Sequence, residues 1–114
     1  MSYVNFSKFR NKKTVIDGLK FDSKKEANRW LVLKMLERSG EISNLQRQVP
    51  FVLLEKEQGF NGETLRQMKY IADFVYNDKR GNRHVEDVKG VRTDVYKIKK
   101  RLMWHIHKIN IEEV

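Results

Sequence analysis

The fold of this chain is decided by two stretches, Tyr70-Ile71-Ala72-Asp73-Phe74-Val75-Tyr76 and His84-Val85-Glu86-Asp87-Val88-Lys89-Gly90. Both are rich in β-branched and aromatic residues, which predicts two strands, and the polar cluster at 77–82 between them is typical of a turn. A carboxylate inside an apolar strand is costly unless something pairs with it, and each strand carries one. A cation shared by the two strands is the simplest explanation.

The spacing within these strands predicts which side chains meet. Residues two apart share a face of a strand, so pairing through the turn brings Asp73 near Asp87, with Lys89 one repeat further along. Glu86 then points to the opposite face, and we expect it to face outward. A slip of one residue in the pairing would exchange Glu86 with Asp87.

The two carboxylates also indicate which cation to expect. Carboxylates, a backbone carbonyl and waters suit a hard cation such as Mg²⁺. The chain has no cysteine, which argues against a structural zinc site and excludes disulfides. A magnesium-type site is therefore predicted.

Hydrophobic periodicity outside the two strands predicts the rest of the fold. The second predicted helix, capped by Thr93 or Asp94, would bury Val95, Ile98, Leu102, Ile106 and Ile109. The expected elements are a short extended piece (14–21), a helix (24–38), a strand (49–54), a loop (55–63), two strands (67–76 and 83–89), a second helix from 93 or 94, and a closing strand (109–112). Their order is helix, three strands, helix, strand.

Length and charge frame the class of protein. The chain has 114 residues and a formal charge of +9, with 39% hydrophobic residues, which predicts one folded domain at 14–114 preceded by a basic flexible arm at 1–13. An anionic partner is expected, and nucleic acid fits better than a membrane because no apolar stretch approaches the length of a spanning helix. No signal peptide or lipidation motif is visible, so a cytoplasmic location is expected.

At this point the residues resemble the PD-(D/E)xK nuclease superfamily. Asp73 resembles the aspartate of the second core strand, with Ala72 in place of the motif's proline, and Asp87-Val88-Lys89 matches D/E-x-K. Glu26 resembles the acid of the first helix. Within the superfamily the chain is similar, over roughly 21–114, to the DUF1064 family of phage and prophage proteins, and to phage endonucleases related to Holliday-junction resolvases.

The resemblance implies a fold, an activity and a site. The fold would be a restriction-endonuclease-like α/β core, a mixed central sheet flanked by helices in the order αβββαβ. Asp73, Asp87 and the Val88 carbonyl would bind Mg²⁺ (or Mn²⁺), with Glu26 reaching the ion through water or holding a second one, and Lys89 would orient the attacking water or neutralise the transition state. The activity would be endonucleolytic hydrolysis of DNA, with branched DNA preferred, by a homodimer in the host cytoplasm.

Several site residues have alternative interpretations. Ser23-Lys24-Lys25-Glu26 is also a capping box, in which Glu26 satisfies a backbone donor at the start of the helix. Asp73 could pair with a strand cation such as Lys69. The residues expected to contact nucleic acid are Lys12, Lys13, Gln48, Thr93, Lys97, Lys100 and Arg101.

Two further functional classes stay open at the level of sequence. One is a non-catalytic nucleic-acid-binding protein that keeps the nuclease-like fold. The other is an RNA-binding or assembly module, for which the basic charge alone would suffice.

Overall fold

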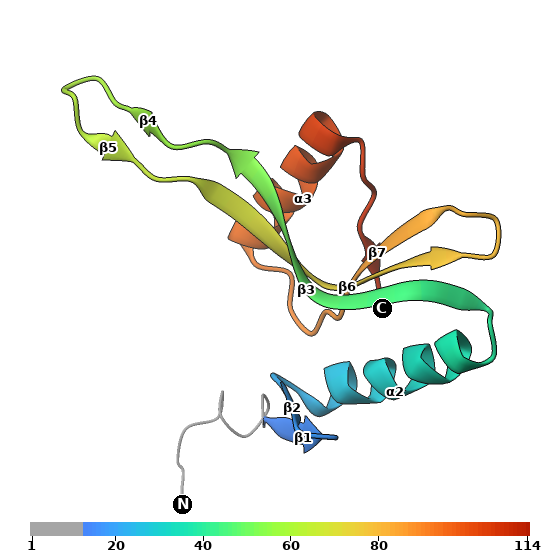
Figure 1. The fold of residues 1–114 in the computed structure, drawn as a ribbon. Coiled ribbons are helices and arrows are strands. Elements are labelled where there is room, and N and C mark those ends of the chain that lie inside the picture. The colour runs from blue at the N-terminus through green and yellow to red at the C-terminus, as the bar shows by residue number, and fades with distance from the viewer. Residues whose placement is uncertain (1–12) are drawn as a thin grey trace, which may run out of the picture.

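The structure, a computed structural model, describes residues 13–114 (Figure 1). Of the predicted basic arm, only Lys13 lies within these residues. The elements in chain order are β1 (Thr14–Ile16), β2 (Leu19–Phe21), α2 (Lys24–Arg38), β3 (Ile42–Leu54), β4 (Glu57–Gln58), β5 (Thr64–Leu65), β6 (Met68–Asp78), β7 (Arg83–Asp87), α3 (Asp94–Leu102), the π-helix η1 (Met103–His107) and β8 (Glu112–Glu113).

The central sheet has four strands in the order β3-β6-β7-β8. Strand β6 is antiparallel to both β3 and β7, whereas β8 is parallel to β7, so the sheet is mixed. Residues 13–114 therefore form a mixed α/β fold with two α-helices, as expected from the sequence. Neither helix in the described residues combines the length and apolarity that crossing a bilayer requires.

The hairpin of β6 and β7 forms as predicted. Its ladder runs from Phe74↔Glu86 to Asn77↔Arg83, and the turn is closed by a hydrogen bond from the Asp78 N–H to the Asn82 carbonyl (2.9 Å). Continuing this register by one residue sets Asp73 opposite Asp87. The ladder itself stops there, because β7 ends at Asp87.

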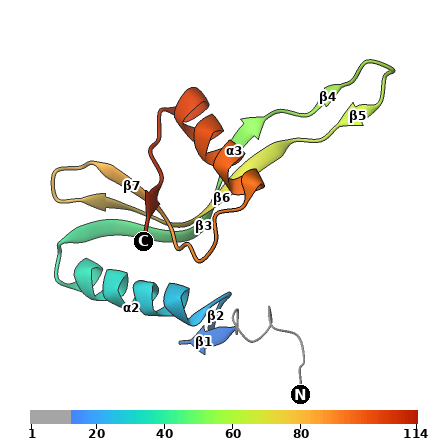
Figure 2. The same cartoon turned by 180° about the vertical axis from the view of Figure 1, so that it is seen from behind.

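The two α-helices lie on opposite faces of the sheet (Figures 1 and 2). Against α2 the core consists of Phe21, Ala27, Trp30, Leu33, Ile42, Phe74 and Tyr76. Against α3 it consists of Leu53, Tyr70, Ala72, Val75, Val85, Tyr96, Met103 and Ile111. Strand β6 contributes to both cores. In a regular strand Ala72 and Phe74 would share a face, but here Ala72 faces α3 and Phe74 faces α2.

This change of face falls at Asp73, where the neighbouring strand is also irregular. Gln48 of β3 lies between the pairs Arg47↔Phe74 and Val49↔Ala72, and its φ of 56° is in the left-handed region. Non-glycine residues seldom adopt that conformation, which costs of order 1 kcal/mol and tends to occur at functional sites. The sheet is thus distorted at the predicted acidic position.

Several predicted boundaries were wrong. Strand β3 begins at Ile42, seven residues before the predicted start, and the predicted loop at 55–63 contains strand β4 and leads into β5. Lys89 follows β7 instead of ending it, and β8 is confined to Glu112–Glu113.

The predicted apolar stripe of the second helix was wrong at three of its five positions, whereas Leu102 and Ile109 do pack against the core. Val95, Ile98 and Ile106 are 62%, 59% and 41% exposed, whereas Tyr96 and Met103 are buried. The physical reason is partly the π-helical segment that follows α3, because its wider turn shifts the phase of the side chains after Leu102. It is also the polar bond that turns Tyr96 inward, from its hydroxyl to Glu113 (2.7 Å).

Candidate functional site

A pocket of about 630 Å³ opens where the middle of β6, at Asp73, and the end of β7 meet the start of α2. The structure brings the predicted catalytic residues Glu26, Asp73, Asp87 and Lys89 together in it. The lining residues are Lys13, Asp22, Ser23, Lys25, Glu26, Asp73, Asp87, Val88, Lys89 and Gly90. We refer to this pocket as the acidic pocket.

Asp73 and Asp87 form the centre of the acidic pocket. The Val88 N–H, which has no strand partner because β7 has ended, donates to Asp73 Oδ2 (2.8 Å). Burial and a hydrogen-bond contact with Asp87 raise the pKa of Asp73 to about 8, against the opposing effect of the Val88 N–H. Two carboxyl groups this close must share a proton unless a cation neutralises them. No ion pair joins Asp73 to Lys69 within residues 13–114, so the alternative pairing is wrong.

Glu26 combines the two roles that its sequence context allowed. Ser23 Oγ accepts the Glu26 N–H (3.1 Å), and Glu26 Oε1 accepts the N–H of Asp22 (3.3 Å), so the side chains do cap α2. Glu26 is nevertheless buried, and its Oε2 accepts a hydrogen bond from Gln48 Nε2 (3.2 Å) inside the site. Burial raises the pKa of Glu26.

Lys89 is held by four contacts although it lies beyond the strand. Its Nζ is 3.0 Å from Asp87 Oδ2 and 3.9 Å from the centroid of the Tyr96 ring. Its backbone N–H donates to the Val114 carbonyl (3.2 Å), and its own carbonyl accepts from Lys25 Nζ (2.8 Å). An ammonium over an aromatic face is attracted by the ring quadrupole, so Tyr96 fixes the position of the charge.

Glu113 in turn anchors Tyr96. Its carboxylate accepts hydrogen bonds from the Tyr96 hydroxyl (2.7 Å), from Lys100 Nζ (2.9 Å) and from Arg92. The same contacts, with the tyrosine first, hold the pKa of Glu113 at about 2. Glu113 and Lys25 were not predicted as parts of the site, since their roles depend on which elements pack together and no local motif marks them.

The acidic pocket offers few groups that could bind the predicted metal ion. Within residues 13–114 no three His, Cys, Asp or Glu side chains are arranged as a ready metal cage. Asp73, Asp87 and the Val88 carbonyl are the pocket's oxygen groups that could hold a hard cation, which would relieve the repulsion between the two carboxylates. Glu26 lines the same pocket, but its carboxylate is hydrogen-bonded to Asp22 and Gln48. The residues fit one hard divalent ion that keeps several waters.

The seven predicted nucleic-acid contacts lie in different parts of the molecule. Lys12 lies outside the described residues, while Lys13 lines the acidic pocket and Gln48 binds Glu26 beside it. Thr93 caps α3, with its Oγ1 accepting the Tyr96 N–H (3.1 Å). The other three, Lys97, Lys100 and Arg101, line a separate hollow of about 330 Å³ and do not face the acidic pocket.

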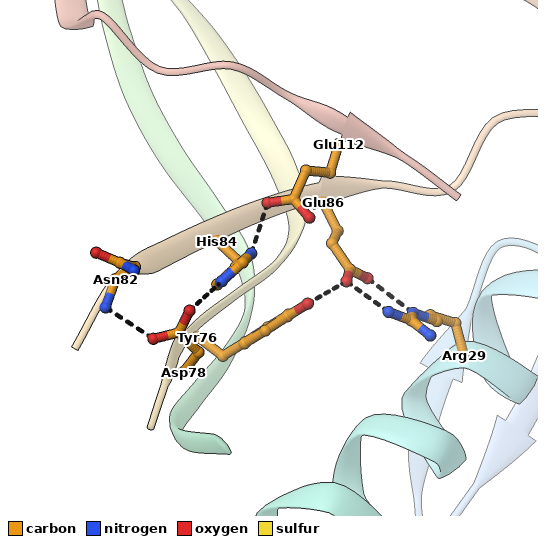
Figure 3. A network of polar contacts seen from close by, with 7 residues as sticks. All are labelled: Arg29, Tyr76, Asp78, Asn82, His84, Glu86 and Glu112. Atoms are coloured by element: carbon orange, nitrogen blue, oxygen red, sulfur yellow. Dashed lines mark hydrogen bonds and ion pairs between the residues drawn. The ribbon is translucent and has the colours of Figure 1, made fainter. Parts of the chain in front are cut away.

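Glu86 does not face outward, so that prediction was wrong. It points away from Asp87, as expected, but toward α2, and it is only 1% exposed. Arg29 Nε and Nη2 donate to its two carboxylate oxygens (2.8 and 2.6 Å), and the Tyr76 hydroxyl also donates to it (Figure 3). The Glu86 carboxylate can be buried because its pairing with Arg29 neutralises its charge.

His84 occupies the neighbouring part of the same polar network. Its ring nitrogens lie 2.8 Å from Asp78 Oδ2 and 2.7 Å from Glu112 Oε2, and the ring stacks on Tyr76 (Figure 3). Hydrogen bonding to Asp78, followed by that to Glu112, raises the pKa of His84. His84 therefore ties β8 to the β6–β7 hairpin.

The fold and the site together define a mixed α/β protein with one polar pocket that pairs two aspartates with a lysine. The chain belongs to the family described as "Protein of unknown function (DUF1064)", whose model matches residues 6–112. No curated protein and no solved structure matches the chain.

Proposed function

We propose that this protein is a metal-dependent endodeoxyribonuclease that hydrolyses phosphodiester bonds. The observation that carries the proposal is the convergence of Asp73, Asp87 and Lys89 in one pocket, where β7 ends beside the middle of β6. An acid pair beside a fixed ammonium is suited to a reaction in which negative charge must be gathered and then stabilised.

The arrangement of elements supports the PD-(D/E)xK relationship. When the short β1–β2 and β4–β5 hairpins and η1 are set aside, the remaining elements run in the order α2, β3, β6, β7, α3 and β8. This order is compatible with the αβββαβ core that the resemblance implies. Asp73 lies on the second of the three consecutive strands and Asp87 ends the third, as the motif requires.

The chain's own residues have distinct roles in the proposed reaction. Asp73, Asp87 and the Val88 carbonyl would hold Mg²⁺ or Mn²⁺, with Glu26 assisting through water or a second ion. A bound divalent cation lowers the pKa of a water and neutralises phosphate charge. Lys89 is placed to orient the attacking water or to stabilise the charge that develops on the phosphate. Tyr96 and Lys25 keep Lys89 in position.

The proposed substrate is DNA, with branched DNA preferred, in phage DNA processing within the host cytoplasm. The formal charge of +9 supports a polyanionic partner. Because a branched substrate is normally cut on opposed strands, the active form is proposed to be a homodimer. The alternative function is a non-catalytic nucleic-acid binder, which is favoured by one observation, the absence of a three-ligand metal cage within residues 13–114.

Cleavage of three labelled DNA forms tests the proposal. A four-way junction, a linear duplex and a single strand are incubated with the wild type, Asp87→Asn or Glu41→Gln, in Mg²⁺ or EDTA. Glu41 is the matched control because its carboxylate lies on the surface and pairs with Lys79. We expect junction cutting that vanishes in EDTA and in Asp87→Asn, but not in Glu41→Gln. Metal-independent binding of the junction without cutting of any DNA form would establish the non-catalytic alternative.

A further inference from the structure

Residues 57–65 form the far end of the β3–β6 ribbon, which we call the ribbon tip. Strands β4 and β5 pair there, and its turn is closed by hydrogen bonds from the Gly59 N–H to the Glu63 carbonyl (2.7 Å) and from the Gly62 N–H to the Gly59 carbonyl (3.1 Å). This turn presents Phe60 with 98% of its side chain exposed. An isolated two-stranded hairpin is marginally stable in water, so such a tip is expected to have a partner.

The charge of the ribbon tip argues against DNA as that partner. It contains Glu57 and Glu63 and no lysine or arginine, although the chain as a whole carries +9. Neither glutamate forms an ion pair with any residue in 13–114. An acidic, aromatic tip is repelled by phosphate and is complementary to a basic surface with an apolar floor.

The hollow beside α3 has those properties. It encloses about 330 Å³, and its apolar lining includes Trp104, which is 53% exposed. Lys97, Lys100 and Arg101 also line it, and within the described residues only Lys100 is paired with a carboxylate. Since a cavity of about 150 Å³ holds a benzene ring, this hollow has room for a phenylalanine side chain.

The tip cannot reach the hollow of its own chain. Helix α3 and η1 are tied to the base of the ribbon, through Lys99 Nζ to the Lys69 carbonyl (3.0 Å) and His107 Nε2 to the Val52 carbonyl (2.7 Å). From Val52 to Phe60 the chain extends away over roughly 25 Å at about 3.3 Å per residue. Both views show the tip projecting from the body, away from α3 (Figures 1 and 2).

We propose that the ribbon tip of one copy docks into the α3 hollow of a second copy, and that the exchange is reciprocal about a two-fold axis. Phe60 enters the hollow near Trp104, while Glu57 faces the free cations Lys97 and Arg101. A two-fold exchange uses the same two patches on both chains and closes the assembly at two. This inference goes beyond the nuclease proposal and does not depend on it, because it stands on the tip and the hollow alone.

Sedimentation velocity without nucleic acid or metal ion tests the docking over a wide range of protein concentration. The wild type is expected to be a dimer, and Phe60→Ser a monomer at the same concentrations. Phe60 is almost fully exposed, so its loss does not threaten the fold. Val15→Ser removes another exposed apolar side chain, away from tip and hollow, and should leave the dimer intact. A wild type that stays monomeric, or a Phe60→Ser dimer as tight as the wild-type one, overturns the proposal.

Charge exchange tests the partner surface. Glu57→Lys and Arg101→Glu should each weaken the dimer by at least tenfold in Kd. An equimolar mixture of the two variants should restore the dimer. In the mixed dimer, one contact keeps the native glutamate and arginine, and the other pairs the introduced lysine with the introduced glutamate. Lack of rescue in the mixture would refute the pairing of tip and hollow. Since no cleavage is measured, an inactive protein that still dimerises in this way would count against the nuclease alone.

Discussion

At the scale of single residues, the acidic pocket depends on where one strand stops. Because β7 ends at Asp87, the next backbone N–H is free, and Asp73 Oδ2 accepts it at 2.8 Å. Asp73 is thereby held against Asp87, although the two carboxyl groups repel each other when both are ionised. Such a pair is stable only with a shared proton or a cation.

Asp73→Asn is expected to stabilise the metal-free protein. Folding raises the pKa of Asp73 from its ordinary value near 4 to about 8. Protonated Asp73 therefore contributes to the free energy of unfolding in full below pH 4, and this contribution is lost as the pH rises through 8. Asparagine does not ionise, and its amide can still accept the Val88 N–H. In EDTA the variant should therefore be more stable than the wild type by about 1–2 kcal/mol at pH 8, and by less at pH 5.

Urea denaturation of both proteins at the two pH values measures this difference. Adding Mg²⁺ should then raise the stability of the wild type but not that of Asp73→Asn, since the variant has lost one of the proposed ligands. A variant less stable than the wild type in EDTA at pH 8 would contradict the electrostatic account of the pair.

Tyr96 is expected to act on activity through Lys89. Tyr96→Leu removes the ring that lies 3.9 Å from Lys89 Nζ, and should lower kcat by about tenfold, the loss that corresponds to ~1.4 kcal/mol of cation–π and positioning energy. Tyr96→Phe keeps the ring and loses only the hydrogen bond to Glu113, so its activity should fall less. Single-turnover cleavage of the proposed substrate compares the two variants. Equal losses in both would assign the effect to the hydroxyl instead of the ring.

At the scale of elements, the parts that the sequence predicted correctly have local causes. The β6–β7 hairpin follows from two runs of β-branched and aromatic residues around a turn cluster, and helix α2 from the Ser23 cap and the spacing of Ala27, Trp30 and Leu33. These signals lie within about fifteen residues of the structure they specify. The meeting of Asp73, Asp87 and Lys89 could be predicted for the same reason.

The wrong predictions depend on contacts between elements distant in the chain. Glu86 is buried because Arg29 of α2 reaches it, and nothing in the sequence of β7 indicates that partner. On α3 the inward-facing residue is Tyr96, which packs in the core and donates a hydrogen bond to Glu113 of another element. Apolar periodicity alone selected Val95 and Ile98, which the structure exposes.

The Arg29–Glu86 pair is expected to hold α2 against the sheet. Arg29→Ala leaves the Glu86 carboxylate buried with only the Tyr76 hydroxyl, and should lower the free energy of unfolding by about 3 kcal/mol. Lys79→Ala breaks an exposed ion pair with Glu41, and should cost less than about 1 kcal/mol. Chemical denaturation at neutral pH measures both. A loss in Arg29→Ala as small as that in Lys79→Ala would mean that Glu86 is neutralised in another way.

At the scale of the whole molecule, the basic charge and the acidic ribbon tip indicate different partners. The excess of lysine and arginine over acidic residues gives the chain +9, and Lys13, Lys25 and Lys89 line the acidic pocket, where a phosphate backbone is proposed to pass. The tip carries the opposite charge and lies at the end of the ribbon. The nucleic-acid surface is therefore expected around the pocket and not along the ribbon.

Salt dependence of DNA binding tests that placement. The Kd for a four-way junction is measured by fluorescence anisotropy in EDTA at several salt concentrations. A plot of log Kd against log salt concentration should rise linearly, with a slope of about 0.9 for each phosphate neutralised. Lys13→Ala should reduce the slope by about one phosphate contact, because Lys13 lies at the pocket. Lys79 lies on the β6–β7 turn and already pairs with Glu41, so Lys79→Ala should leave the slope unchanged. If Lys79→Ala lowered the slope and Lys13→Ala did not, DNA would bind at the β6–β7 turn, and the acidic pocket would lose its proposed substrate.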